Sequence, residues 1–432
     1  MDSLTLPAVR GAFGSVQPPG SKSISNRVLP LAALASGTTT LENLPDGEDV
    51  ELMRSALGKL GISMDEIKQI LTVKGLGCAF KTKEPLNLFL GNSGTSMRTL
   101  AALSCAGSGE FILDGVARMR ERPIADLIDA LQPIAGRTTL TYMGQPGYPP
   151  LRISAQGLEG GRTRIRGNVS SQFLTGLLLS MPLCSGSVEV QLEGVLSSSP
   201  YIALTLRIME AFGVHVENQN FRRFILAKPE GYRSPGHFVV EPDASSASYF
   251  LAAGAIAGAV EVRGLNRESL QGEAKFSEVL QRMGAQVEYG PMGIKVSQGT
   301  LHGIDADMDL MSDTGMTLAV TALFAKGPTK IRNIGTWRVK ETDRIAAMAT
   351  ELRKVGATVE EGADWLSIHP PQTFQRAEID TYEDHRIAMC FSLVSLGKVP
   401  VTIRNPGCTR KTYPGYFENF QKLVSESEGL EQ

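Results

Sequence analysis

The hydrophobic and polar positions of this chain follow a divergent pattern that repeats about every 70 residues, a period too long for a solenoid. Each copy opens with small or polar residues and continues into an apolar stretch with helical spacing. Gly or Lys-Gly follows, and then a β-rich stretch. The similarity is visible between residues 245–251, 316–322 and 386–391. The copies begin near Lys22, Asn92, Ser170, Asp243, Asp313 and Asp384.

A second helix is predicted about 30 residues after the start of each copy. Most of these helices end at a glycine followed by a short β-run, and glycine in that place is typical of a helix C-cap. The glycines are Gly61, Gly213, Gly284 and Gly356. The clearest second helices are 50–60, 124–134, 202–212, 276–283 and 344–355. The sixth follows Tyr413-Pro414 and runs to the end of the sequence.

The repeating unit is therefore predicted as a helix, a β-pair, a second helix and further β-strands. Six copies divide into two groups of three, which predicts an α/β protein with two similar domains. The alternative is the ordinary alternation of helices and strands in α/β proteins. That alternative gives no reason for the same order to recur six times at nearly even spacing.

Composition excludes several functional classes. A length of 432 residues fits about two or three domains, and a formal net charge of −2 gives no basic footprint for nucleic acid. The first residues lack the basic and apolar regions of a signal peptide, and the most apolar run, 173–184, is too short to span a bilayer. The five cysteines form no Cys-x-x-Cys pair and the five histidines no His-Glu-x-x-His motif. We therefore expect a reduced, cytoplasmic protein without a preformed metal site.

The most informative short segment runs from Pro19 to Arg27. Its Pro-Gly turn predicts a helix that opens with Ser21, Lys22 and Ser23, so unpaired backbone N–H groups and the positive end of the helix dipole meet a lysine and two hydroxyls. Ser23 and Arg27 are four residues apart and share a helix face. This pattern is typical of an anion site, with a capped helix and two solvated cations as the alternative. It is neither a Walker A loop nor a dinucleotide-binding turn.

Polar residues also stand where the other copies begin. Residues 91–98 read Gly-Asn-Ser-Gly-Thr-Ser-Met-Arg, and their small side chains let backbone amides approach a ligand. The remaining openings include Ser170-Ser171-Gln172, Asp313 and Asp384-His385-Arg386. Each one alone could be an ordinary cap. Six of them on a repeated scaffold predict a shared cleft lined by helix N-termini, with a positive potential despite the net charge.

Clusters of basic residues add to this potential. Arg118, Arg120 and Arg122 alternate, so in an extended segment they would point the same way, with surface solvation as the alternative. Arg410-Lys411 precedes the last predicted helix.

A further cluster pairs Lys340 with Arg344. These like charges stand at the i, i+4 spacing of a helix, which is unfavourable unless an anion lies between them or acids compensate. Glu341 and Asp343 are the acids within reach, so both interpretations remain open.

Seven of these segments resemble the 5-enolpyruvylshikimate-3-phosphate synthase family of enolpyruvyl transferases. They occur in the family's order and are spread over essentially the whole chain. The segments are 19–27, 90–98, 118–123, 169–173, 243–250, 337–344 and 384–389.

The resemblance implies a fold of two similar domains, each built from three β-α-β-α-β-β units, with the active site in the interdomain cleft. It also implies that the first strand belongs to the domain of copies four to six. One domain is then expected to comprise residues 1–20 plus 242–432, and the other residues 21–241.

The resemblance further implies transfer of the enolpyruvyl group of phosphoenolpyruvate to the 5-hydroxyl of shikimate 3-phosphate, with release of phosphate. Both substrates are polyanions, and the planar fork of arginine binds carboxylates and phosphates bidentately. The residues that match the family's shikimate 3-phosphate site are Ser23, Arg27, Ser170, Ser171, Gln172, Ser198, Tyr201, Asp313, Thr336 and Lys340. Those that match its phosphoenolpyruvate site are Lys22, Asn92, Gly94, Thr95, Arg122, Gln172, Arg344, His385, Arg386 and Lys411.

The chemistry implied is addition followed by elimination through a tetrahedral intermediate. By resemblance, Asp313 and Lys22 act on the attacking hydroxyl, and Glu341 acts on the methylene carbon. No metal or organic cofactor is expected. The family is usually monomeric, so a monomer without nucleic-acid or membrane partners is expected.

The chain departs from the family pattern at three places. The usual Ser-Lys-Pro-Tyr reads Ser198-Ser199-Pro200-Tyr201 and loses one cation, and the usual Asn before Trp337 is Thr336. Both changes concern the shikimate 3-phosphate site. Arg98 is followed by Thr99 instead of the usual Pro, beside the expected site of the inhibitor glyphosate.

Two other functions remain open at this stage. The UDP-N-acetylglucosamine enolpyruvyl transferases share the fold, but usually carry a reactive cysteine in the loop equivalent to 115–122, where this chain has none. A non-catalytic anion-binding protein is the second alternative. It would not need Lys22, Asp313 and Glu341 together.

Overall fold

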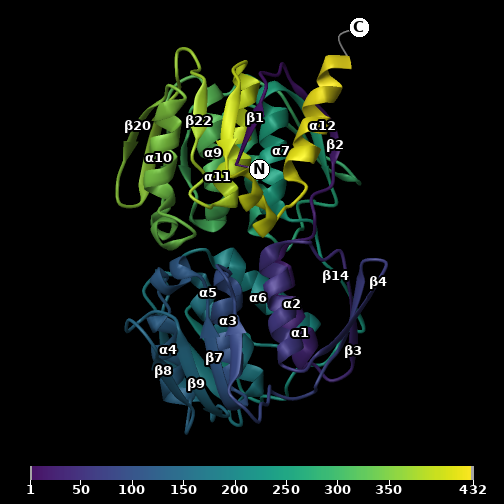
Figure 1. Cartoon of the computed structure of the whole chain (residues 1–432), viewed down its shortest axis with the longest axis vertical. Coiled ribbons are helices and arrows are strands. Elements are labelled where there is room, and N and C mark those ends of the chain that lie inside the picture. Colours follow the sequence, from purple (N-terminus) through teal and green to yellow (C-terminus); the bar gives the residue numbers. More distant parts are fainter. Residues whose placement is uncertain (1, 430–432) are drawn as a thin grey trace. The chain divides into compact units, whose positions relative to one another are not determined.

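The computed structural model describes residues 2–429, which form two compact units (Figure 1). The terminal unit consists of Met1–Pro19 and Glu241–Gln432, and the central unit consists of Gly20–Val240. No helix within residues 2–429 is long and apolar enough to cross a membrane.

The middle repeat of the central unit shows the folding pattern most simply. Its elements are β6 (Leu86–Phe89), α3 (Gly94–Cys105), β7 (Ser108–Asp114), α4 (Ala125–Leu131), β8 (Thr139–Tyr142) and β9 (Leu151–Gln156). Strand β6 runs parallel to β7, and the antiparallel hairpin of β8 and β9 completes the sheet in the order β6-β7-β9-β8. The repeat is therefore a β-α-β-α-β-β unit.

The last repeat of the central unit has the same order, and the first repeat borrows a strand. The last repeat comprises β10 (Gly161–Arg166), α5 (Ser171–Ser180), β11 (Val188–Glu193), α6 (Ser199–Ala211), β12 (Glu217–Gln219) and β13 (Arg223–Leu226). The first comprises α1 (Lys22–Leu34), β3 (Thr38–Glu42), α2 (Glu48–Lys59), β4 (Ser63–Ile67) and β5 (Ile70–Lys74). Its missing strand is β14 (His237–Val239), which pairs in parallel with β3.

The terminal unit repeats this arrangement. Its first repeat comprises β2 (Ala12–Val16), α7 (Ala244–Ala257), β15 (Gly258–Arg263), α8 (Phe276–Met283), β16 (Gln286–Tyr289) and β17 (Gly293–Ser297). The second comprises β18 (Asp305–Asp307), α9 (Gly315–Thr321), β19 (Thr329–Arg332), α10 (Arg344–Lys354), β20 (Thr358–Glu361) and β21 (Trp365–His369). The third comprises β22 (Ala377–Ile379), α11 (His385–Phe391), β23 (Val401–Arg404), α12 (Tyr416–Gly429) and β1 (Ser3–Leu6).

The amino-terminal strands complete two sheets of the terminal unit. Strand β2 pairs in parallel with β15, and β1 pairs antiparallel with β23. The predicted α/β class and the six-fold repeat are thus confirmed.

Short 3-10 helices connect many of these elements. They are η1 (Ala117–Glu121), η2 (Gln132–Ile134), η3 (Met181–Leu183), η4 (Gly272–Lys275), η5 (Asp309–Thr314), η6 (Ala322–Phe324), η7 (Gly335–Val339), η8 (Ser392–Gly397) and η9 (Pro406–Lys411).

Local sequence explains where most helices begin and end. Side chains of five N-cap residues accept a hydrogen bond from a backbone N–H in the first turn of α1, α5, α7, α10 and α11. These caps are Ser21, Ser170, Asp243, Asp343 and Asp384. At the other end, the four glycines predicted as C-caps all have positive φ, which glycine adopts without strain. Their φ values are +83° at Gly61, +80° at Gly213, +115° at Gly284 and +99° at Gly356.

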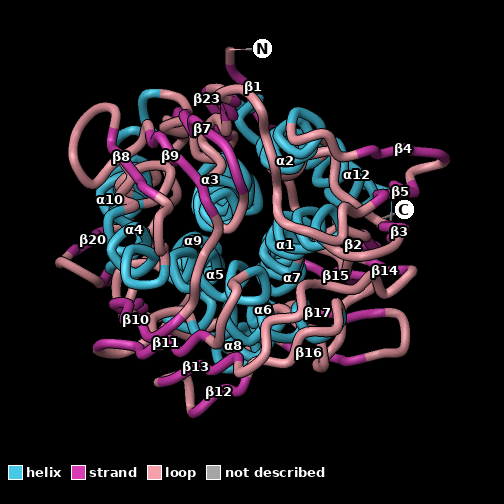
Figure 2. Tube along the Cα trace, turned by 90° about the horizontal axis from the view of Figure 1, so that it is seen from below, coloured by secondary structure: helices cyan, strands magenta, loops and turns pink. Residues whose placement is uncertain are grey.

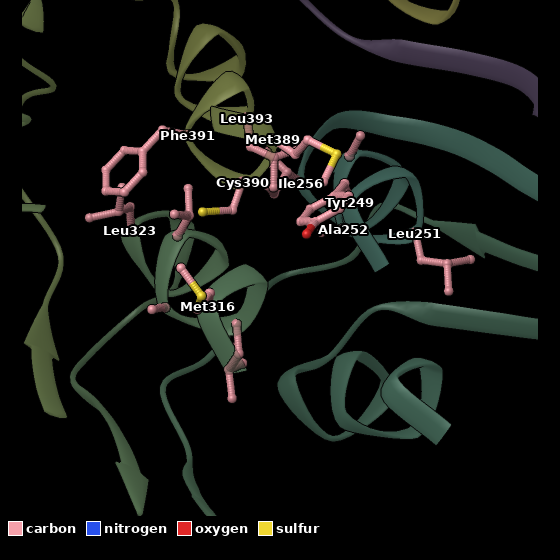
Figure 3. Close-up of a cluster of buried hydrophobic side chains, with 14 of the residues drawn as sticks. Tyr249, Leu251, Ala252, Ile256, Met316, Leu323, Met389, Cys390, Phe391 and Leu393 are labelled. Atoms are coloured by element: carbon pink, nitrogen blue, oxygen red, sulfur yellow. The ribbon is translucent and has the colours of Figure 1, made fainter. Parts of the chain in front are cut away.

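The first helices of the repeats form the core of each unit. In the central unit, α1, α3 and α5 lie inside a ring of three sheets (Figure 2). In the terminal unit, every residue of α7 from Ala244 to Ile256 is buried, because its side chains are small or apolar on all sides. Figure 3 shows Tyr249 of α7, Met316 of α9 and Met389 of α11 in one cluster of buried side chains. This packing fixes the helix N-termini that carry the candidate site residues.

Candidate active site

Arg344 organises the polar cluster of the terminal unit. Its side chain, at the first position of α10, is only 1 % exposed. The guanidinium donates to Asp384 at 2.7 Å, to Glu341 at 2.8 Å and to Asp313 at 3.1 Å. One arginine thus holds three carboxylates that come from the openings of three repeat helices.

Two further cations surround Asp313. Nη2 of Arg386 lies 2.8 Å from Oδ2 of Asp313, and Nζ of Lys340 lies 3.7 Å from Oδ1. With Arg344, Asp313 therefore contacts three cations, which stabilise its negative charge. Arg386 also reaches the hydroxyl of Tyr249 at 3.4 Å. Three predicted anion-binding residues of this unit, Lys340, Arg344 and Arg386, thus converge on the predicted catalytic carboxylate.

The carboxylates around Arg344 stabilise its positive charge. Burial opposes the charged form, but the carboxylates of Asp384, Glu341 and Asp313 outweigh this effect and raise the pKa of Arg344 above its ordinary value. Arg386 acts in the opposite direction but less strongly. Arg344 therefore remains a cation at any working pH.

The predicted i, i+4 relation of Lys340 and Arg344 is wrong. Lys340 follows η7 with extended backbone, and α10 begins only at Arg344. The two cations meet at Asp313 because the chain turns between them. Glu341 compensates Arg344 as expected, whereas Asp343 caps α10 and pairs with Arg338 at 2.7 Å.

Other predicted residues of the terminal unit lie on the same elements. His385 is fully buried, with Nδ1 3.6 Å from Oδ1 of Asp384. Lys411 ends η9 and is 7 % exposed, and Thr336 is half-buried within η7. Within residues 2–429, no group of three or more His, Cys, Asp or Glu side chains is arranged to hold a metal ion.

In the central unit, Lys22 and Ser23 open α1 as predicted. The Lys22 side chain is 14 % exposed, and its Nζ lies 3.4 Å from Oδ2 of Asp49, which is almost fully buried. Asp49 was missed by sequence reasoning. A signal exists, because Asp49 occupies the buried face of α2 with Met53 and Ala56.

Arg27 connects three helices of the central unit. Its guanidinium donates to the carbonyl of Ser23 at 2.6 Å, to Thr205 of α6 at 2.9 Å and to Thr175 of α5 at 3.2 Å. The side chain is 3 % exposed. Arg27 therefore has a structural role in addition to the ligand role that remains a prediction.

Gly94, Arg122 and Gln172 meet at the start of α3. A Cβ atom placed on Gly94 would lie 2.4 Å from Nη2 of Arg122 and 2.9 Å from Oε1 of Gln172, so no larger residue fits without displacing them. Arg122 also donates to the backbone carbonyl and side-chain oxygen of Asn92, at 2.9 and 3.0 Å. Thr95 is the second residue of α3. Residues predicted for one anion are thus brought together from two repeats.

The predicted alignment of Arg118, Arg120 and Arg122 is wrong. Residues 117–121 form the 3-10 helix η1, so alternate side chains do not share a direction. Arg118 pairs with Glu121 at 2.8 Å and Arg120 with Asp114 at 2.6 Å. Of the three, Arg122 is the one placed beside Gly94.

The remaining predicted residues begin α5 and α6. Ser170 caps α5, and Ser171 and Gln172 are its first two residues. Ser198 precedes α6 in a left-handed conformation with φ of +58°, and Tyr201 lies in the first turn. A serine in this conformation is uncommon and is often found at functional sites.

Comparisons with known proteins show first the fold of this chain and then its family. An enolpyruvyl transferase from Streptomyces tendae, NikO, superimposes with a TM-score of 0.77 over 98 % of this chain and 97 % of its own, at 19 % identity, which shows the shared fold. An EPSP synthase from Acinetobacter baumannii superimposes with a TM-score of 0.81 over 98 % of both chains, at 27 % identity.

Sequence relatives are closer. A 3-phosphoshikimate 1-carboxyvinyltransferase from Psychromonas ingrahamii is 54 % identical over 99 % of this chain and 100 % of its own. One of the same name from Aeromonas salmonicida is 52 % identical over the full length of both chains. The profile of the EPSP synthase (3-phosphoshikimate 1-carboxyvinyltransferase) family matches residues 10–420. The chain therefore belongs to the EPSP synthase family, which confirms the resemblance, the fold class and the assignment as a carboxyvinyl-transferring enzyme.

Proposed function

We propose that this chain transfers the enolpyruvyl group of phosphoenolpyruvate to the 5-hydroxyl of shikimate 3-phosphate and releases inorganic phosphate. The main observation behind the proposal is that the carboxylate of Asp313 contacts three cations, Lys340, Arg344 and Arg386. A base among fixed cations suits a reaction in which the hydroxyl of one polyanion attacks another polyanion. Membership of the EPSP synthase family supports the same reaction.

Phosphoenolpyruvate is proposed to bind to arginines of both units. Arg122 beside Gly94 and Gln172 supplies a guanidinium fork in the central unit, and Arg344 and Arg386 supply two more in the terminal unit. Forks of this kind match the carboxylate and phosphate of the substrate. Lys22, Asn92, Thr95, His385 and Lys411 complete the proposed set.

Shikimate 3-phosphate is proposed to bind to hydroxyls and cations at the helix openings. Such openings suit a sugar-like phosphate, because hydroxyls and backbone N–H groups lie together there. The proposed residues are Ser23, Arg27, Ser170, Ser171, Gln172, Ser198 and Tyr201 in the central unit, and Asp313, Thr336 and Lys340 in the terminal unit.

The reaction is proposed to proceed in two steps. In the addition, the 5-hydroxyl oxygen bonds to C2 of phosphoenolpyruvate, its proton passes to Asp313 or Lys22, and Glu341 delivers a proton to the methylene carbon. In the elimination, the bond from C2 to the phosphate oxygen breaks and the new methyl group returns a proton. Positive charge around Asp313 stabilises the anionic intermediate.

The terminal and central units are proposed to be the two domains of the enzyme, with crossings near residues 20 and 241. Because each substrate would take ligands from both units, substrate binding is proposed to draw them together and exclude water. We further propose a cytoplasmic monomer without nucleic-acid or membrane partners. The net charge of −2 supports the absence of a nucleic-acid partner.

Phosphate release tests the proposed function directly. The purified chain is mixed with phosphoenolpyruvate, and phosphate is measured with and without shikimate 3-phosphate. Release that requires both compounds is expected. Release without shikimate 3-phosphate, or with UDP-N-acetylglucosamine in its place, would contradict the proposal.

Thiol labelling provides a second prediction, because it separates this function from a cysteine-dependent enolpyruvyl transfer. Burial raises the pKa of Cys184 and Cys408 to about 12, and also raises that of Cys105 and Cys390. Cys78 is the exposed cysteine. We expect a chromogenic disulfide reagent at pH 8 to label Cys78 quickly, the other four slowly, and to leave phosphate release unchanged.

The location of Cys78 explains why its modification should be harmless. The backbone N–H of the neighbouring Gly77 donates a hydrogen bond to the carbonyl of Ala35. Ala35 lies at the C-terminal end of α1, about 20 Å along the helix from Lys22. Cys78→Ser is the control and should abolish the fast phase. Inactivation in step with labelling of another cysteine would favour the cysteine-dependent mechanism.

Thr99 leads to a third prediction, lowered sensitivity to glyphosate. Thr99 is fully buried in α3, and its hydroxyl has no hydrogen-bond partner within residues 2–429. Proline in its place would remove a helical N–H and push against the preceding turn, which contains Gly94 and Thr95. With threonine, the first turn of α3 can move toward the ligand and narrow the proposed phosphoenolpyruvate site. Glyphosate is longer than phosphoenolpyruvate, so its binding should be weakened more.

The test compares Thr99→Pro with Thr99→Val. We expect Thr99→Pro to lower the ratio of the glyphosate inhibition constant to the phosphoenolpyruvate KM by about tenfold. Thr99→Val removes the hydroxyl but keeps the N–H, so it should leave this ratio unchanged. An unchanged ratio in the proline variant would show that residue 99 does not determine inhibitor selectivity.

A further inference from the structure

The segment that leads into α11 is attached to helix α10 at two points. At its far end, Asp384 accepts the hydrogen bond of Arg344 at 2.7 Å. At its near end, the backbone N–H of Asp380 donates to Glu351 at 3.1 Å, and the hydroxyl of Tyr382 donates to the other oxygen of Glu351 at 2.8 Å. Residues 344 and 351 are seven apart, two helical turns, and so lie on one face of α10.

Glu351 is a fully buried carboxylate outside the expected site. Lys354 balances its charge at 2.8 Å and also contacts Asp380 at 2.7 Å. A buried carboxylate is retained only where charge and hydrogen bonds compensate it. Glu351 accepts from Asp380 and Tyr382 and pairs with Lys354, which itself contacts Asp380, so Glu351 acts on the approach to α11.

The backbone of this segment is held in an unusual conformation. Tyr382 and Glu383 have φ values of +52° and +57°, so two consecutive non-glycine residues are left-handed. Such conformations persist where the surroundings impose them, and they cluster at functional sites. The next residues are Asp384, His385 and Arg386, which open α11. Burial and the hydrogen bond to Glu351 also raise the pKa of Tyr382, so its hydroxyl stays a donor.

We propose that Glu351 and Tyr382 are positioning residues, which hold the left-handed turn. They thereby place Asp384, the acceptor of Arg344, and the two residues that follow it, His385 and Arg386, which belong to the proposed phosphoenolpyruvate site. The inference rests on the proposed function of this site. It assigns a role to two residues outside the proposed substrate sites. Tyr382 acts through the backbone, and Glu351 acts through Tyr382 and Asp380.

The first test uses Tyr382→Phe, which keeps the ring and removes the hydroxyl. We expect the KM for phosphoenolpyruvate to rise by about tenfold and the KM for shikimate 3-phosphate to stay nearly constant, because the displaced residues belong to the former site. Glu351→Gln should act in the same direction, and the double variant should be no worse than the poorer single variant. A merely structural role would lower the unfolding midpoint without changing one KM alone.

Matched variants sharpen the result. Tyr289→Phe removes another bonded hydroxyl of the terminal unit, 3.0 Å from Ser277, and should leave both KM values unchanged. Adding Glu383→Asn to Tyr382→Phe should partly restore the phosphoenolpyruvate KM, since asparagine tolerates the left-handed conformation. Unchanged KM values in Tyr382→Phe would overturn the proposal, and so would a raised phosphoenolpyruvate KM that Glu383→Asn does not lower.

Hydrogen exchange separates this proposal from the proposed function. Amide exchange in a peptide covering 380–386 should accelerate by about tenfold in Tyr382→Phe, whatever reaction the enzyme catalyses. Unchanged exchange would overturn the clamp itself, that is, the attachment of residues 380–382 to Glu351. Faster exchange with an unchanged phosphoenolpyruvate KM would overturn its positioning role. An inactive wild-type chain would contradict the proposed function, and the exchange result would still decide whether the clamp exists.

Discussion

Lys22→Ala is expected to reduce turnover by about 1000-fold or more, equivalent to a barrier higher by roughly 4 kcal/mol. Lys22 stands at the positive end of α1 with its ammonium group 3.4 Å from Asp49 and its side chain partly exposed. A cation in this place can stabilise charge that develops during the addition and can relay the hydroxyl proton. The measurement is kcat for phosphate release at saturating concentrations of both substrates.

Lys22→Ala removes the cation beside the buried Asp49 and should therefore lower the unfolding midpoint. The chain should still fold, because the cap from Ser21 and the buried face of α1 from Ile24 to Leu34 remain. Circular dichroism and the unfolding midpoint check this point. Lys59→Ala is the matched control, since Lys59 is an exposed lysine at the end of the neighbouring helix α2. Turnover of Lys22→Ala within about tenfold of the wild type, roughly 1.4 kcal/mol, would disprove a catalytic role.

Arg344→Ala is expected to destabilise the terminal unit by about 3–5 kcal/mol and to abolish activity. The substitution removes the partner of three carboxylates, of which Asp384 and Glu341 are 0 % and 8 % exposed. Buried carboxylates left without their cation carry the full cost of desolvation. Tryptophan fluorescence in a denaturant titration measures the effect, because both tryptophans, Trp337 and Trp365, lie in the terminal unit.

Arg353→Ala on the same helix is the matched control. Arg353 is 45 % exposed and contacts Glu361 at 3.4 Å, and an exposed pair of this kind contributes about 1 kcal/mol or less. A similar small loss for Arg344→Ala would mean that the three carboxylates find other partners. Full activity in Arg344→Ala would disprove its proposed contact with phosphoenolpyruvate.

Local signals explain the part of the fold that the sequence predicts well. Helix α8 was predicted at its observed bounds, and a glycine with positive φ follows it as expected. Helix caps and C-terminal glycines act through hydrogen bonds and backbone angles within a few residues. The sequence of a single repeat is therefore enough to predict where its helices begin and end. For the same reason the helix starts could be predicted from the sequence, and the candidate site residues were found there.

Side-chain partners were predicted less well. Arg118 and Arg120 were expected to point with Arg122, but nearby acids and a 3-10 turn redirect them. Arg27 was expected either to bind an anion or to be solvated, but hydroxyls from α5 and α6 accept hydrogen bonds from its guanidinium. Such partners belong to other elements, and spacing along one segment does not reveal them.

By itself, the sequence determined the α/β class, the six repeats and the polar and charged residues at their openings, because these depend on local periodicity, capping and composition. Only the tertiary structure decided that β14 completes the sheet of β3, that β1 pairs with β23 and β2 with β15, and that Arg344 gathers three carboxylates. These contacts join residues far apart in the chain. They form because burying the helices of each unit brings distant segments together, and no local propensity specifies which segments will meet.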